Sequence, residues 1–201
     1  MKLYDISQEV FGCAVYPGDP VPKRESLSRM EAGDLYNLTA FSMCAHNGTH
    51  VDAPHHFIQE GNTVDQIPLE KTVGLCFVAE WNGVLGGEDA RRILHRAALA
   101  ARESARRILL KGDATVSAEA ARIFVGGGVD LIGNESQTVG PEDAPMEVHK
   151  ILLEKNVVLP EGIVLDNVSE GKYFLSAAPL NLAGCDGAPC RAYLMDQMKE
   201  K

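Results

Sequence analysis

The segment from His46 to Phe57 reads His-Asn-Gly-Thr-His-Val-Asp-Ala-Pro-His-His-Phe and gathers side chains that suit a metal ion. In an extended segment alternate side chains point to one face, so His50 and Asp52 can converge on one cation, and His46 shares their parity. Imidazole nitrogens and carboxylate oxygens suit zinc, manganese or iron(II), and no nearby Cys pair closes a structural zinc site. We therefore expect an open, catalytic metal centre.

Two other histidines do not fit this pattern. A single histidine is more often an ordinary core or surface residue than a ligand. His55 has the opposite parity and is expected to point away from the metal ligands. His95 falls within a predicted helix without a ligand partner at helical spacing, so we interpret it as structural.

The pattern His-x-Gly-Thr-His-x-Asp-x-Pro-x-His-Phe resembles the signature of the cyclase family of metal-dependent hydrolases, which includes bacterial kynurenine formamidase and isatin hydrolase. The resemblance implies that His46, His50 and Asp52 hold a first metal. It also implies that Asp52 bridges to a second metal and that His56 is the catalytic acid/base.

Three further segments extend the resemblance. The family's second ligand pair, a His followed twelve residues later by a Glu, is matched by His149 and Glu161. Glu161 lies between two apolar runs, and we expect it at a break between strands. Residues 16–19 (Tyr-Pro-Gly-Asp) resemble the family's aromatic-Pro-Gly-Asp segment, which implies that Tyr16 lines the substrate pocket where kynurenine formamidases have Trp. Residues 187–191 (Gly-Ala-Pro-Cys-Arg) resemble its Gly-Ala-Pro-x-Arg segment.

These features predict a metal-dependent hydrolase that cleaves an amide or formamide C–N bond of a small aromatic substrate. One or two zinc or manganese ions per chain are implied, with hydroxide formed on the metal as nucleophile and His56 carrying the proton. No Gly-x-Ser-x-Gly elbow supports a serine nucleophile. Two alternatives stay open: hydrolysis of a cyclic amide or imide of the isatin type, and a metal-binding protein without activity.

Composition limits the other functions. The 201 residues carry a formal charge of −9, which argues against unspecific binding to nucleic acid or an anionic membrane. No apolar run approaches the roughly 20 residues needed to cross a bilayer. Five cysteines without pairwise spacing and an N-terminus without an apolar signal core favour a cytoplasmic location. The family resemblance implies a homodimer or a higher homo-oligomer.

The elements that must position the candidate ligands are strands with a few helices between them. This alternation predicts an α/β fold, most simply one domain over residues 1–201. The resemblance implies a swivelling β/β/α fold with a barrel-like, mainly β core. Strands are expected over residues 3–6, 37–43, 73–80, 107–111, 129–132, 157–159, 163–165, 173–183 and 191–195, and helices over 88–102, 118–124 and 146–155, with Ser117 as an N-cap.

Overall fold

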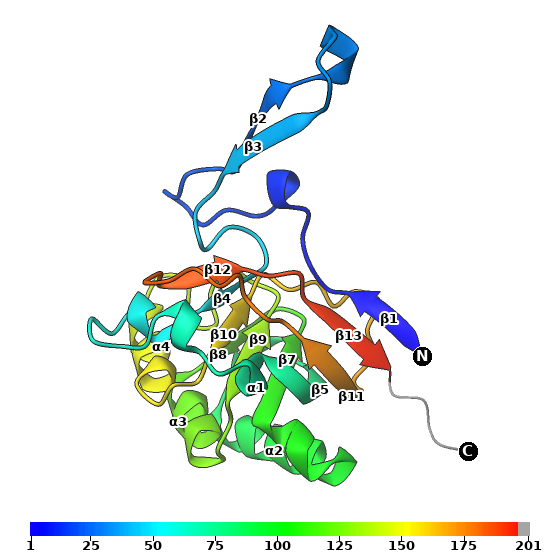
Figure 1. Cartoon of the computed structure of the whole chain (residues 1–201). Helices are drawn as coiled ribbons and strands as arrows, with labels where there is room; N and C mark the ends of the chain where they lie inside the picture. Colours follow the sequence, from blue (N-terminus) through cyan, green and yellow to red (C-terminus); the bar gives the residue numbers. More distant parts are fainter. Residues whose placement is uncertain (197–201) are drawn as a thin grey trace.

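The computed structural model describes residues 1–196, whose largest element is a six-stranded mixed sheet (Figure 1). Its strand order is β1-β13-β11-β5-β7-β9, antiparallel from β1 to β5 and parallel from β5 to β9. The bounds of these strands are β1 Lys2–Asp5, β5 Val73–Glu80, β7 Arg107–Lys111, β9 Leu131–Asn134, β11 Gly171–Ser176 and β13 Tyr193–Asp196.

The central strands are buried on both faces, which explains their nearly continuous apolar sequences. In β5, Phe77 and Ala79 belong to the core cluster under the helices, whereas Cys76 and Val78 belong to the cluster on the opposite face. The predicted strands over 73–80 and 107–111 are confirmed residue for residue.

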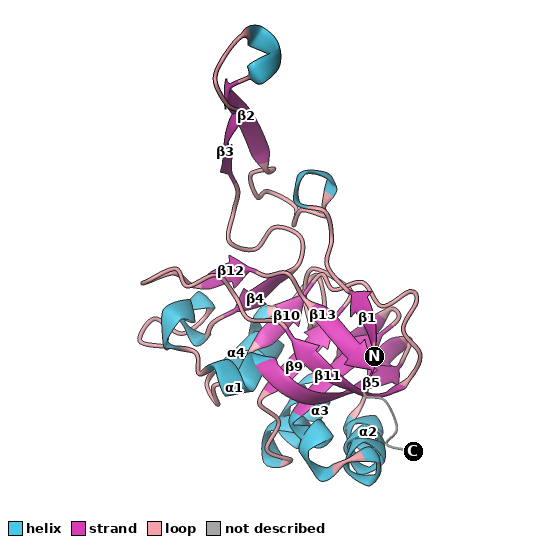
Figure 2. Ribbon diagram, turned by 45° about the vertical axis from the view of Figure 1, so that its right-hand side comes forward, coloured by secondary structure: helices cyan, strands magenta, loops and turns pink. Residues whose placement is uncertain are grey.

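The three longer helices pack on one face of this sheet (Figures 1 and 2). Ser117 caps α3 as predicted, because its hydroxyl accepts the N–H of Ala120 at 3.1 Å. The predicted helix over 88–102 ends earlier, and residues 102–106 form a 3₁₀ turn instead. The helices are α1 Leu69–Thr72, α2 Gly87–Ala100, α3 Ala118–Gly126 and α4 Met146–Leu153.

A second sheet, which is antiparallel, contains His50 and Asp52 of the candidate metal-binding segment. Its order is β10 (Leu159–Glu161), β4 (His50–Asp52) and β12 (Gly187–Pro189). A single parallel bridge between Leu131 and Val158 links β9 to the segment that enters β10. Glu161 thus ends a strand, so the expectation of a break at this position is wrong, as is the strand over 163–165.

The sheet-dominated α/β class is confirmed, but a barrel-like core is not. No sheet within the described residues is closed: β1 pairs only with β13, and β9, at the other end, pairs with β7 and otherwise makes only the isolated bridge to Val158. The barrel and the swivelling β/β/α assignment stay predictions.

A long hairpin projects from the body of the molecule (Figures 1 and 2). It consists of β2 (Lys23–Ser28) and β3 (Leu38–Ser42), which pair only with each other among the described residues. The strand expected over 37–43 therefore exists, but it is separate from the strand that holds the metal motif. A tight turn at Cys44–Gly48 divides them, with Gly48 at φ 62°. A second two-stranded sheet, β6 (Gly83–Leu85) with β8 (Ala114–Val116), is parallel.

Two features bear on the expected location. Over residues 1–196, none of the helices is both long and apolar enough for a transmembrane span. The five cysteines are all free thiols. The cytoplasmic location itself stays a prediction.

Candidate metal and catalytic centre

Strand β4 is the middle strand of its sheet and places His50 and Asp52 on one face. Both are buried, at 2 % and 1 % exposure. Glu161 of β10 lies directly across from His50 and is also buried. The distance from His50 Nε2 to Asp52 Oδ1 is 3.3 Å, and to Glu161 Oε2 it is 3.9 Å. Strand pairing therefore brings together side chains that are more than a hundred residues apart.

His46 reaches the same point from the turn that precedes β4. Its Nδ1 lies 2.8 Å from Asp52 Oδ1. The expected convergence of these two residues is thus present, but the reason given for it, an extended run with shared parity, is wrong. The turn at Gly48, not a strand, carries His46 toward Asp52.

Helix α4 supplies His149 from the other side. Its Nδ1 donates to the carbonyl of Pro145 at 2.8 Å, which turns Nε2 toward Glu161 Oε1 at 3.2 Å and Asp52 Oδ2 at 3.7 Å. His50 is oriented in the same way, because its Nδ1 donates to the carbonyl of Gly48 at 2.9 Å. Backbone acceptors of this kind fix the tautomer of a ligating imidazole.

Asp52 is the shared member of two groups with metal-binding geometry. One is His46, His50 and Asp52, the other is Asp52, His149 and Glu161, and in each the candidate ligand atoms lie within 4.8 Å of one another. Asp52 Oδ2 is fully buried yet has no hydrogen-bond partner among the described residues. Such an orphaned carboxylate oxygen is costly unless a cation satisfies it. The residues present therefore fit a divalent metal on chemical grounds.

The electrostatics of the cluster agree with this fit. Burial lowers the pKa of His46, but Asp52 and Asp186 outweigh burial and raise it to about 10. Burial is likewise outweighed by acidic neighbours at His50 and His149, where the pKa is raised. At Asp52 burial raises the pKa, yet the adjacent imidazoles hold it well below its usual range. The buried Asp52 carboxylate thus stays ionised and keeps positive charge beside it.

His56 lies next to the cluster, on the 3₁₀ turn Pro54–His56 that follows β4. Its ring stacks on that of His46 with centroids 4.0 Å apart. Burial is the largest influence on His56 and lowers its pKa, so the ring is neutral and able to accept a proton near neutral pH. Its position beside the candidate ligands is what an acid/base requires.

Asp186 is a residue that the sequence reasoning missed. Its Oδ2 lies 2.8 Å from His46 Nε2 and 3.3 Å from His56 Nδ1. The sequence feature that could have pointed to Asp186 is its position directly before the Gly-Ala-Pro-x-Arg segment at 187–191.

A cavity of about 400 Å³ opens onto these side chains. Tyr16 lines it from a turn in which the N–H of Asp19 donates to the Tyr16 carbonyl at 3.0 Å. Its wall includes further residues that the sequence did not single out as pocket-lining, namely Asp19, Cys44, Phe57, Gln137, Thr138 and Pro145. The aromatic and apolar side chains of this wall can hold a flat ring close to the candidate metal ligands.

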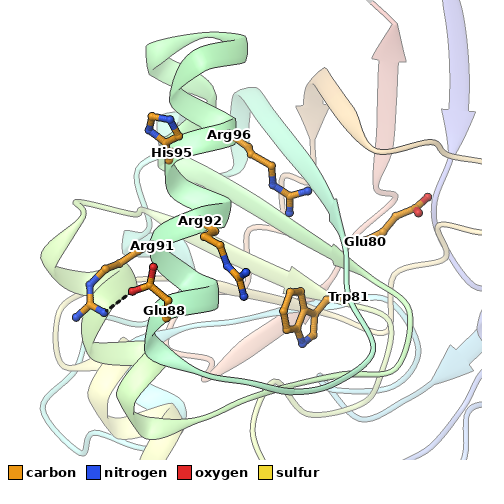
Figure 3. A pocket seen from close by; sticks show the side chains of 7 residues that line it. All are labelled: Glu80, Trp81, Glu88, Arg91, Arg92, His95 and Arg96. Atoms are coloured by element: carbon orange, nitrogen blue, oxygen red, sulfur yellow. Dashed lines mark hydrogen bonds and ion pairs between the residues drawn. The ribbon is translucent and has the colours of Figure 1, made fainter.

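A larger hollow of about 700 Å³ lies between α2 and the end of β5 and shares no residue with this cavity (Figure 3). Its arginines are compensated by acids: Arg91 pairs with Glu88 at 3.2 Å, and Arg96 with Glu170 at 2.7 Å. His95 borders the hollow as an exposed side chain. We assign no chemistry to this hollow.

Comparison with known proteins places these observations in a family. Residues 4–141 match the family model described as "Putative cyclase". The chain is 35% identical to a kynurenine formamidase of Salinibacter ruber, over 98% of each chain. It is 32% identical to the kynurenine formamidase of Erythrobacter litoralis, over 97% of this chain and 94% of that one.

Solved structures agree with this match. One titled as a potential metal-dependent hydrolase with cyclase activity superposes with a TM-score of 0.81 at 28% identity, covering 98% of this chain and 99% of that chain. Isatin hydrolase A from Labrenzia aggregata superposes with a TM-score of 0.79, covering 96% of this chain and 93% of that one. At 21% identity this second likeness concerns the fold alone.

Proposed function

Because the chain belongs to the cyclase family, we propose that it is a metal-dependent hydrolase that cleaves the C–N bond of an aryl formamide or a related aryl amide. The observation that carries the proposal is the buried Asp52, shared by two ligand groups beside a neutral histidine in a cavity with aromatic walls. The curated relatives favour formamidase over isatin-type hydrolysis. They also disfavour a binding protein without activity, which would have no use for His56.

His46, His50 and Asp52 would hold one divalent cation, and Asp52, His149 and Glu161 a second. We propose zinc or manganese, because both accept this mixture of imidazole and carboxylate donors. A cation held there polarises a carbonyl oxygen and lets a water molecule lose a proton near neutral pH.

The chain's own residues manage the proton and the substrate. His56 takes the proton from the attacking water and returns it to the departing nitrogen. Hydrolysis of an aryl formamide thereby consumes one water and yields an aryl amine and formic acid. Tyr16 and Phe57, which line the cavity, would hold the aryl ring in place.

Glu161→Gln tests the second metal position. The carboxamide keeps the size of the side chain but loses the negative charge, so we expect wild type to bind up to two metals per chain and the variant fewer. Elemental analysis at saturating zinc measures the stoichiometry. Equal metal content in both proteins would remove Glu161 from the ligand set.

Tyr16→Ala tests the aromatic wall. A ring stacked on Tyr16 gains about 0.5–1.5 kcal/mol beyond burial, so we expect KM for aryl substrates to rise roughly 2- to 13-fold with kcat little changed. Steady-state kinetics measure both constants. Tyr16→Trp is the paired variant, because it introduces the residue that the family resemblance associates with kynurenine formamidases. An unchanged KM in Tyr16→Ala would contradict a substrate contact.

The activity itself is tested with the wild-type protein, loaded with zinc or manganese and assayed on N-formylkynurenine, simple aryl formamides and isatin. We expect the formamides to be hydrolysed and isatin to react more slowly. Turnover of isatin alone would favour the cyclic-amide alternative. Tight metal binding without any turnover would favour a binding protein.

We also propose that the chain works as a homodimer or a higher assembly. The support comes from the hairpin formed by β2 and β3: no residue from 20 to 42 is buried in the described structure, and an isolated two-stranded hairpin is marginally stable in water. Its exposed apolar side chains are Val21, Leu27, Met30, Leu35, Tyr36, Leu38 and Phe41. A second copy of the chain would cover them.

Leu35→Glu tests the assembly, because Leu35 is 93% exposed at the hairpin tip. A buried charge at a subunit interface is costly, so we expect the variant to shift the protein toward monomers. Light scattering at micromolar concentration measures the mass. The matched control is Leu99→Glu, an exposed leucine on α2 whose replacement should leave the mass unchanged. A monomeric wild type would refute the assembly.

A further inference from the structure

One oxygen of Asp186 faces two imidazoles at once. Asp186 Oδ2 lies 2.8 Å from His46 Nε2 and 3.3 Å from His56 Nδ1. The two rings are stacked, with 29° between their planes, so their nitrogen-bearing edges can meet the same carboxylate. Asp186 is thus in contact with both a candidate metal ligand and the candidate acid/base.

The chemistry of these contacts fixes where protons reside. An ionised carboxylate only accepts hydrogen bonds, so each nitrogen that faces Asp186 must carry a proton. In neutral His56 this leaves Nε2 with the free lone pair that a general base needs. His46 must give up one proton to bind a metal, and its contact with Asp186 would then leave Nδ1, the nitrogen 2.8 Å from Asp52, as the atom able to ligate.

Asp186 is itself held in place by its backbone. Its carbonyl accepts the N–H of Ala53 at 2.9 Å, and the next residue, Gly187, pairs with Asp52 across β12 and β4. A Cβ at Gly187 would lie 2.7 Å from His46 Cε1, so the segment packs tightly against that ring. The side chain of Asp186 is nevertheless 45% exposed, which means that the core does not depend on it.

We propose that Asp186 is a positioning residue that fixes the tautomer of His56, and through the same oxygen that of His46. The inference rests on the proposed function, since it assigns His56 the role of base. A side chain that merely stabilised the loop would not need to face both rings through one oxygen.

The first test reads the tautomer directly and needs no substrate. In zinc-loaded protein with ¹⁵N-labelled histidine, NMR above neutral pH should show His56 protonated at Nδ1, with the signals assigned by comparison with His56→Ala. Asp186→Asn offers an amide that can donate as well as accept, so we expect a mixed or reversed tautomer. An unchanged His56 tautomer in Asp186→Asn would overturn the proposal, even if no substrate had been found.

The second test uses kinetics at saturating zinc, with metal content measured in every variant. Asp186→Asn should lower kcat roughly 10- to 100-fold with KM little changed, and Asp186→Glu should restore part of the loss. In the His56→Ala background, compared at equal metal content, Asp186→Asn should cost no further kcat, because its effect on proton transfer passes through His56. Additive losses, or a loss explained by missing metal, would refute the assignment.

Asp65→Asn is the matched control. Asp65 Oδ1 accepts the N–H of Gly184 at 3.0 Å, so it anchors the same loop as Asp186, but within residues 1–196 it forms no hydrogen bond with a histidine. Its replacement should leave kcat and the His56 tautomer unchanged. If Asp65→Asn reproduced the effects of Asp186→Asn, loop anchoring would replace histidine positioning as the explanation.

Discussion

Asp52→Ala should abolish metal binding at both positions, the largest effect expected of any single substitution in this chain. Asp52 is the one residue common to the two ligand groups, and its Oδ2 has no hydrogen-bond partner among the described residues. Asp52 helps to raise the pKa of three neighbouring imidazoles, those of His46, His50 and His149. The alanine variant removes this negative charge. Elemental analysis after dialysis against zinc should find no bound metal, and hydrolysis should fall to the level of metal-free protein.

Two controls separate ligand loss from misfolding. Asp52→Asn keeps the size of the side chain and should also lose metal while its circular dichroism matches that of wild type. His55→Ala removes an imidazole from the same segment and should keep full metal content, because His55 lies outside both ligand groups. Full metal occupancy in Asp52→Ala would show that the cluster is only a set of buried ion pairs.

His56→Ala should keep its metal and lose activity, by roughly 10²- to 10⁴-fold in kcat if His56 is the general acid/base. His56 is outside the two ligand groups that share Asp52, yet it lines the same cavity and stacks on His46. Removing the ring therefore removes the proton carrier without removing a ligand.

The decisive comparison is between metal content and kcat within the same preparation. His56→Ala with wild-type metal content and wild-type kcat would exclude His56 from the reaction. If metal were lost instead, His56 would be a ligand. His46, His56 and Asp186, whose candidate ligand atoms also lie within 4.8 Å of one another, would then form a further metal-binding group.

How much of this could be predicted from the sequence depends on where the relevant signal lies. Strands β5 and β7 were predicted with their correct bounds, because burial on both faces leaves a continuous apolar run. The two candidate ligands on β4 could also be singled out, since His50 and Asp52 alternate within a short segment. In both cases the pattern lies within one short segment, so the sequence alone shows it.

Other features depend on pairing between distant segments. Strand β2 reads Lys-Arg-Glu-Ser-Leu-Ser, a polar sequence that forms a strand only because β3 pairs with it. Glu161 was expected at a break because a charge between apolar runs suggests a turn, whereas its pairing with His50 makes it the end of β10. Asp186 carries only an indirect signal, its position directly before the Gly-Ala-Pro-x-Arg segment at 187–191. It reaches His46 and His56 because β12 pairs with β4.

A crystal structure of the zinc-loaded protein, with anomalous data collected at the zinc absorption edge, tests the central claim most directly. We expect an anomalous peak in contact with Asp52 and flanked by His46 and His50, and a second peak between Asp52, His149 and Glu161. Zinc-saturated crystals whose anomalous peaks all lie away from Asp52 would contradict it.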